Sequence, residues 1–204
     1  MHVTQHHEIT EPKLVSALWK LYEAGHSTLT GQVPSRVVLY RHEFEDELRA
    51  SGVRIWVVWD DELPVALSVV DTDLAENRWV SPAYLSTVYA DAWSAGRVHY
   101  ICLLVVHPDY QGSGAFGLLV QRGFELEAAE GATLVFDVPS VNQPTAESGL
   151  AQTALRFALQ SGGARLEEIE VQRFFALTFG APADRGEPRE LDHGVGMRRR
   201  EIAG

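Results

Sequence analysis

The sequence has very little cysteine and no long apolar run. Its single cysteine, Cys102, excludes an intrachain disulfide and a metal site built from several cysteines, and it fits a reducing compartment such as the cytoplasm. No segment approaches the roughly 20 consecutive apolar residues that span a bilayer. Residues 1–13 also lack the basic and apolar regions of a signal peptide. We therefore expect a cytoplasmic protein that does not contact a membrane.

Positive charge is also scarce. The 17 Lys and Arg residues face 28 Asp and Glu residues, which gives a formal net charge of -11. The basic residues form no cluster apart from Arg198–Arg200, so no nucleic-acid partner is expected. An acidic surface suits a cationic substrate. An anionic ligand would have to be attracted by local backbone dipoles, because the overall field repels it.

The length and the apolar content predict one domain. With 204 residues and 46% hydrophobic content, the chain can bury a core. We predict a single domain over 1–179 and a loosely structured tail over 180–204, which is rich in Gly, Pro, Arg and Glu. An aromatic-rich insertion at about 72–98 is interpreted either as a satellite core or as a lid over a substrate.

The hydrophobic pattern predicts a mixed α/β fold. Strands are predicted at 2–9, 54–59, 64–70, 101–106, 133–138 and 165–179. Helices are predicted from Pro12 onward and at about 35–50, 82–95, 115–130 and 144–160. The polar residues 60–62 between two β-rich segments indicate a hairpin.

The most informative segment is ICLLVVHPDYQGSGAFG, residues 101–117. A short apolar strand ends at His107-Pro108, the glycine-rich turn Gln111–Gly114 follows, and a helix begins directly after it. Glycine permits such a tight turn, and the free N–H groups at a helix N-terminus favour an anion. The arrangement predicts a phosphate or pyrophosphate site.

This segment resembles the shared motif of the GNAT superfamily of N-acyltransferases, which runs approximately V-x-P-x-x-[QR]-G-x-G-x-[GA]. The matching residues are Val106, Pro108, Gln111, Gly112 and Gly114. The resemblance implies a mixed, mostly antiparallel central sheet that is flanked by helices and splayed at the central strand. It also implies transfer of an acetyl or other acyl group from acyl-coenzyme A to a primary amine on a small molecule, with no metal.

The resemblance further implies which residues hold the acyl-coenzyme A. The strand would lie beside the pantetheine arm, and the turn amides would hold the pyrophosphate. These cofactor-binding residues are Leu104, Val105, Val106, Gln111, Gly112, Ser113, Gly114, Ala115 and Phe116, with Asn142 in the loop beyond the next strand.

Two neighbouring residues are the catalytic candidates. Many family members place a Glu general base six residues before the motif Val, and that position here is Tyr100, next to His99. A neutral imidazole is the better base near pH 7, whereas Tyr100 has the better position. Side chains alternate along a strand, so only one of the two can face the cleft. Asp137 in the following strand is a further base or orienting residue.

The sequence departs from the family pattern in three places. Phe116 occupies the last small position of the motif. Ala158 stands where many members carry a Tyr acid, and no Tyr follows Tyr110. Asn142 lies further before Gly162 than is usual. Two alternatives therefore stay open: a coenzyme A-binding module without catalysis, and an acyltransferase whose donor is an acyl carrier protein. A homodimer is also left open.

Overall fold

The computed structural model describes residues 1–27, 31–33 and 38–178. The predicted tail at 180–204 and the start of the predicted helix at 35–50 lie outside the described residues. The chain divides into two compact units, 1–172 and 173–204. None of the helices in the described residues is long and apolar enough to cross a membrane.

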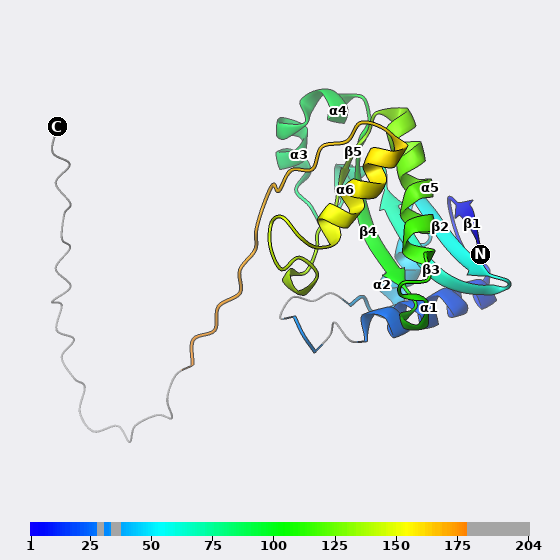
Figure 1. Ribbon diagram of the computed structural model, residues 1–204. Coiled ribbons are helices and arrows are strands. Elements are labelled where there is room, and N and C mark those ends of the chain that lie inside the picture. Colours follow the sequence, from blue (N-terminus) through cyan, green and yellow to red (C-terminus); the bar gives the residue numbers. More distant parts are fainter. Residues whose placement is uncertain (28–30, 34–37, 179–204) are drawn as a thin grey trace, which may run out of the picture. The chain divides into compact units, whose positions relative to one another are not determined.

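One five-stranded sheet organises the first unit (Figure 1). Its strand order is β1-β2-β3-β4-β5, and neighbouring strands are antiparallel except for the parallel pair β4 and β5. The predicted mixed, mostly antiparallel sheet with flanking helices is confirmed. In chain order the elements are β1 (His2–His6), α1 (Pro12–His26), α2 (Arg41–Glu47), β2 (Val53–Asp60), β3 (Leu63–Asp71), α3 (Pro82–Val88), α4 (Ala90–Ser94), β4 (Val98–Val106), α5 (Ala115–Glu130), β5 (Thr133–Val135) and α6 (Leu150–Ser161), with short 3-10 helices at Leu74–Glu76, Pro108–Tyr110 and Ser140–Asn142.

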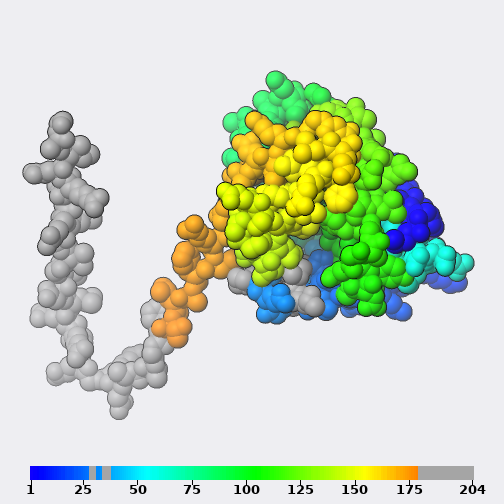
Figure 2. All heavy atoms as spheres, viewed as in Figure 1, coloured from blue at the N-terminus to red at the C-terminus, as the bar shows by residue number. Residues whose placement is uncertain are grey.

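The sheet is covered on both faces, as the nearly continuous apolar sequence of β2 and β3 requires. Ile55 and Val57 of β2 pack in a core cluster with α1 and α2. The intervening Trp56 and Val58 pack on the other face against α5. Figure 2 shows atoms of α6 lying against those of α5, so this face carries two helices. The alternation of side chains along each strand thus builds two separate cores.

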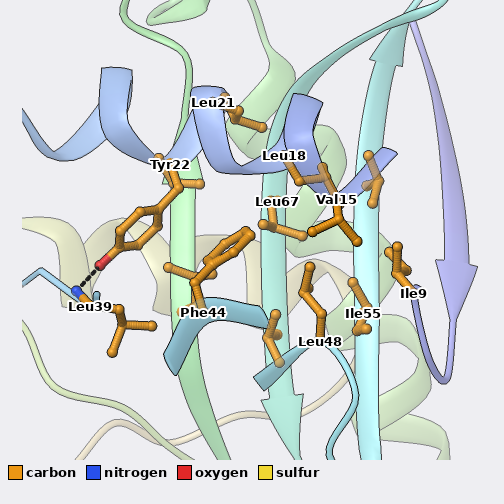
Figure 3. Packing of buried hydrophobic residues seen from close by; sticks show 14 of the residues in the cluster. Ile9, Val15, Leu18, Leu21, Tyr22, Leu39, Phe44, Leu48, Ile55 and Leu67 are labelled. Carbon is orange, nitrogen blue, oxygen red and sulfur yellow. Dashed lines mark hydrogen bonds between the residues drawn. The ribbon is translucent and has the colours of Figure 1, made fainter. Parts of the chain in front are cut away.

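The cluster beneath α1 and α2 is closed by an aromatic residue with a polar end (Figure 3). Leu18, Phe44 and Leu48 are fully buried there. The hydroxyl oxygen of Tyr22 accepts a hydrogen bond from the Leu39 amide at 2.6 Å. A backbone donor that would otherwise be buried without a partner is therefore satisfied from α1.

The aromatic-rich segment forms a satellite core. Leu74, Leu85 and Tyr100 are buried together, and Tyr89 and Trp93 pack against them. This packing favours the satellite core over a lid. The single helix predicted over 82–95 is two short helices, because the backbone at Tyr89 leaves the helical region (φ -115°, ψ 43°).

Two C-terminal predictions need correction. The helix predicted from residue 144 begins at Leu150, because Gly149 has φ +147°, which breaks helical geometry. The strand predicted at 165–179 is not formed, since no described residue after β5 belongs to a strand. Within the described part of the chain, these residues pair with no neighbouring strand that could complete their backbone hydrogen bonds.

Replacing two helical glycines, Gly25 and Gly123, with alanine should change the free energy of unfolding in opposite directions. A Cβ at Gly25 would lie 2.0 Å from Val105 Cγ2 and 3.2 Å from the Val106 carbonyl oxygen. Gly25→Ala should therefore lower the free energy of unfolding by about 1–3 kcal/mol or more. A Cβ at Gly123 meets only Trp56 Nε1, at 3.8 Å, so Gly123→Ala should raise it by about 0.4–1 kcal/mol. Urea unfolding of both variants tests this, and equal effects would contradict the packing of α1 on β4.

Candidate functional site

The glycine-rich turn joins the end of β4 to the start of α5. After the 3-10 helix Pro108–Tyr110, residues 111–114 form an exposed turn. Gly112 and Gly114 have φ of +77° and +93°, a region that side chains with a Cβ disfavour. No heavy atom lies within 4 Å of the position that a Cβ would take at either glycine. The backbone of the turn therefore adopts positive φ at both glycines, and the space beside each of them is open.

Backbone donors converge on this open space. Leu118 makes the first N–H bond inside α5, to the Gly114 carbonyl at 2.9 Å. The amides of Phe116 and Gly117 come before it and have no acceptor within the helix. The Ala115 amide donates to Ser113 Oγ at 3.3 Å, and that hydroxyl donates to the Tyr110 carbonyl at 2.7 Å. Ser113 therefore braces the turn, and the amides of Phe116 and Gly117 stay free at the helix N-terminus, a position that favours an anion.

Phe116 does not crowd the turn. Its ring lies edge-on to Phe157 of α6, with 5.9 Å between the ring centroids. It packs against a buried cluster made by Val120, Phe124 and Ala154. The phenyl group thus belongs to the contact between α5 and α6. This placement removes the observation that motivated an acyl carrier protein as the donor.

The sheet opens between β4 and β5. The two strands pair only from Val98 to Tyr100 of β4, although β4 continues to Val106. His107 donates its N–H to the Val65 carbonyl at 2.8 Å, so by alternation Val105 also bonds to β3. The main-chain groups of Leu104 and Val106 therefore point toward the open side. Leu104, Val105 and Val106 were all predicted to contact the donor. The main-chain groups of Val105 are bonded to β3, so only those of Leu104 and Val106 are available on the open side.

Asn142 ends the 3-10 helix that follows β5. Its amide donates to the Pro139 carbonyl at 2.8 Å, and its side chain is partly exposed. The residues between Asn142 and α6 that exceed the usual spacing form a loop, and the side chain of Gln143 connects this loop to α6 by hydrogen bonds. Gln143 Oε1 accepts from the Ala151 amide at 3.0 Å, and its Nε2 donates to Gln152 Oε1 at 2.6 Å. The longer spacing is thus explained by a loop that caps α6.

His99 and Tyr100 point to opposite faces of the sheet, as predicted. His99 is only 1% exposed. Its Nδ1 lies 2.5 Å from Glu127 Oε2 of α5, and its Nε2 lies 3.3 Å from the Gly96 carbonyl oxygen. Both ring nitrogens have protein partners in the interior. His99 is therefore not placed to take a proton from a substrate, which corrects its assignment as a catalytic candidate.

His99 belongs to a buried charge network. Arg54 of β2 donates from Nη1 to Glu127 Oε1 at 3.0 Å and from Nη2 to Glu130 Oε2 at 2.8 Å. His99, Glu127 and Glu130 each bring one potential metal-ligand atom within 4.8 Å of the others. The Arg54 guanidinium already forms ion pairs with both carboxylates, so we interpret the network as an ion-paired link between β2, β4 and α5. Arg54 lies 73 residues from Glu127, and His99 lies 28 residues from it, so no local sequence pattern signals these contacts.

Tyr100 is paired with Asp137. Its hydroxyl donates to Asp137 Oδ1 at 2.5 Å. Burial, together with the Asp137 carboxylate, raises the pKa of Tyr100 far above its usual value. The phenol therefore stays protonated and acts as a donor, not as a base. Asp137 is exposed and follows β5, so it is the proton acceptor of the pair.

Cys102 lies two residues beyond Tyr100 on β4. Burial and the carboxylates of Glu47 and Asp71 raise the pKa of its thiol well above its usual value. The neutral thiol is a poor nucleophile. In this environment Cys102 serves as a small apolar residue that packs against the satellite core.

Comparison with known proteins relates the chain to acetyltransferases through its fold. No family model and no curated protein sequence matches it. A candidate acetyltransferase from Pyrococcus horikoshii superimposes with a TM-score of 0.53 at 15% identity, over 70% of this chain and 83% of the other. An aminoglycoside acetyltransferase from an uncultured soil metagenomic sample reaches 0.49 at 14% identity, over 86% and 95%. The ribosomal-protein-S18-alanine N-acetyltransferase from Escherichia coli reaches 0.48 at 12% identity, over 78% and 76%.

The charge network should make a measurable contribution to stability. Arg54→Ala leaves Glu127 buried without its cation, so the free energy of unfolding should fall by about 3–5 kcal/mol. Arg122→Ala is the matched control, because its pair with Glu125 is exposed and should contribute at most about 1 kcal/mol. Chemical denaturation measures both. Equal losses would show that Arg54 does not compensate a buried charge.

Proposed function

Given that this chain has the fold of the GNAT superfamily of N-acyltransferases, we propose that it transfers an acyl group from an acyl-coenzyme A to a primary amine. One observation carries the proposal. The open edge of β4 leads directly into a turn whose free amides lie at the N-terminus of α5. In an acyl-coenzyme A the thioester and the pyrophosphate lie at opposite ends of one extended arm. The open strand edge would take the arm, and the turn at its end would take the pyrophosphate.

The turn would bind the pyrophosphate of the donor. Gly112 and Gly114 keep the space beside the backbone open, and the amides of Phe116 and Gly117 donate into it. The formal charge of -11 gives no general attraction for an anion, so these local dipoles supply the binding energy. The main-chain groups of Leu104 and Val106 would hold the pantetheine arm and polarise the thioester carbonyl.

Asp137 would act as the general base. Its carboxylate accepts a proton from the acceptor amine, directly or through water. Tyr100 is a positioning residue, because its hydroxyl holds one carboxylate oxygen in place. The nitrogen, freed of that proton, then forms a bond to the carbonyl carbon, its second surplus proton passes to solvent, and the carbon–sulfur bond breaks. The departing thiolate leaves with that electron pair and takes its proton from solvent, since no tyrosine follows Tyr110.

The acceptor would be a cationic amine. Glu47, Asp71 and Asp137 act on Tyr100 or Cys102 through their negative charge. Glu47 is paired with Arg78, and Asp71 accepts a hydrogen bond from Asn77 Nδ2 at 2.8 Å. Asp137 has no cationic partner among the described ion pairs. Its charge would attract an ammonium group toward the opening between β4 and β5.

Calorimetry with coenzyme A tests the donor site. Gly114→Ala should raise the Kd at least about tenfold, because a methyl group would enter the open space and strain a residue with positive φ. Gly96→Ala is the matched control. Gly96 also has positive φ (+64°) and an open surrounding, but it precedes the other end of β4. Absence of binding to the unmodified protein would overturn the proposed function.

An assay of thiol release with a panel of cationic amines tests the base. Asp137→Asn should lower kcat by about 10²- to 10⁴-fold while leaving the Kd for coenzyme A unchanged. Asp91→Asn, an exposed acidic residue of α4, is the control and should retain full activity. Full activity of Asp137→Asn would exclude Asp137 as the base. Coenzyme A binding without turnover for any amine would instead favour a binding module.

A further inference from the structure

A small cavity with two polar side chains in its wall lies between α5 and the sheet. Its volume is about 20 Å³, which is enough for one group of the size of a water molecule. Most of the wall is apolar, but Trp56 of β2 and Ser68 of β3 also line it, and they are only 8% and 6% exposed. The two side chains therefore make the cavity a site for a polar group.

Trp56 brings a buried donor without an acceptor to this cavity. In the described part of the chain, no hydrogen-bond partner reaches its Nε1, although buried N–H groups are nearly always bonded. Gly123 of α5 keeps the space beside this atom open, because a Cβ there would meet only Nε1, at 3.8 Å. Ser68 stands directly opposite Trp56 in the ladder of β2 and β3, so its hydroxyl lies on the same face beside the indole.

The cavity borders the opening between β4 and β5. Ile101, the first residue of β4 beyond the paired stretch, lines it together with Leu104, and Leu134 lines it from β5. These side chains lie on the face of the sheet that α5 covers. The bond of Tyr100 to Asp137 lies on the opposite face. A group held in the opening would therefore have the carboxylate on one side and the cavity on the other.

We propose that the cavity receives the outer end of the donor's acyl group and that this end carries a hydroxyl. The inference rests on the proposed function. With the pyrophosphate at the glycine turn, the arm runs back along β4, so the thioester lies toward the closed end of the opening, where β4 and β5 pair. The amine comes from the face of Asp137, and the acyl chain extends toward α5. The small volume limits this chain to a short one.

The polar atoms of the wall select the kind of acyl group. The indole N–H of Trp56 can only donate, whereas the Ser68 hydroxyl can donate or accept. A substrate hydroxyl would accept from the first and donate to the second, so all three groups would be satisfied. A carboxylate would lie beside Glu127, which also lines the cavity, and a second buried negative charge there is unfavourable. The cavity therefore fits a hydroxyacyl group better than a hydrocarbon or a dicarboxylic acyl group.

Calorimetry with four-carbon thioesters tests the inference. At least one of 3-hydroxybutyryl- and 4-hydroxybutyryl-coenzyme A should bind the unmodified protein about threefold to tenfold more tightly than butyryl-coenzyme A, because its hydroxyl reaches Nε1. Succinyl-coenzyme A should bind more weakly than that thioester. Trp56→Phe should abolish the preference and leave the Kd for coenzyme A unchanged. Trp59→Phe is the matched control, because Trp59 Nε1 already donates to Thr4 Oγ1 at 2.8 Å, and it should keep the preference.

Gly123→Ala gives a second test in which no core side chain is lost. The added methyl group would lie beside Nε1 and should abolish the preference for the hydroxyl, although the variant is expected to be more stable. Three results would overturn the inference alone: equal Kd values for butyryl- and both hydroxybutyryl-coenzyme A, tightest binding of succinyl-coenzyme A, or a preference that survives Trp56→Phe or Gly123→Ala. Absence of binding to coenzyme A itself would overturn the proposed function as well, so the two failures are distinguishable.

Discussion

The separation of β4 from β5 after Tyr100 is the constraint on which the candidate site depends. Up to that residue β4 has hydrogen-bonded strands on both sides, and beyond it β3 is the one strand among the described residues that pairs with β4. The backbone of Leu104 and Val106 is thereby left open on one side. The same strand then delivers the chain to the glycine-rich turn, so the two parts of the site share one rigid support.

Two adjacent residues hold the closed end of this opening. His99 ties β4 to α5 through Glu127, which Arg54 connects to β2. Tyr100, on the opposite face, ties β4 to the residue that follows β5 through Asp137. The two residues that the sequence identified as rival bases therefore make their contacts on opposite faces of the sheet, His99 with Glu127 and Tyr100 with Asp137.

Local patterns predicted much of this architecture. The hairpin of β2 and β3, the glycine turn and the extent of α5 each depend on neighbouring residues, and all three were predicted correctly. The start of α6 was not, because it depends on Gly149 and on the contact of Gln143 with Ala151, eight residues away. The strand predicted at 165–179 failed for a different reason. Its pattern is present, but a strand also needs a partner, which sequence periodicity does not specify.

The sequence by itself determined the glycine turn and the helix that follows it, because glycine conformations and helix N-termini are local properties. It also determined that His99 and Tyr100 face opposite ways, since side chains alternate along any strand. Only the tertiary structure decided their roles. Whether an imidazole is a base or a buried partner depends on the charges that the fold brings to it, and Arg54 and Glu127 come from distant elements. Likewise, only the tertiary structure showed that the Phe116 ring points away from the turn. Its direction follows from the packing of α6 on α5, where it contacts Phe157.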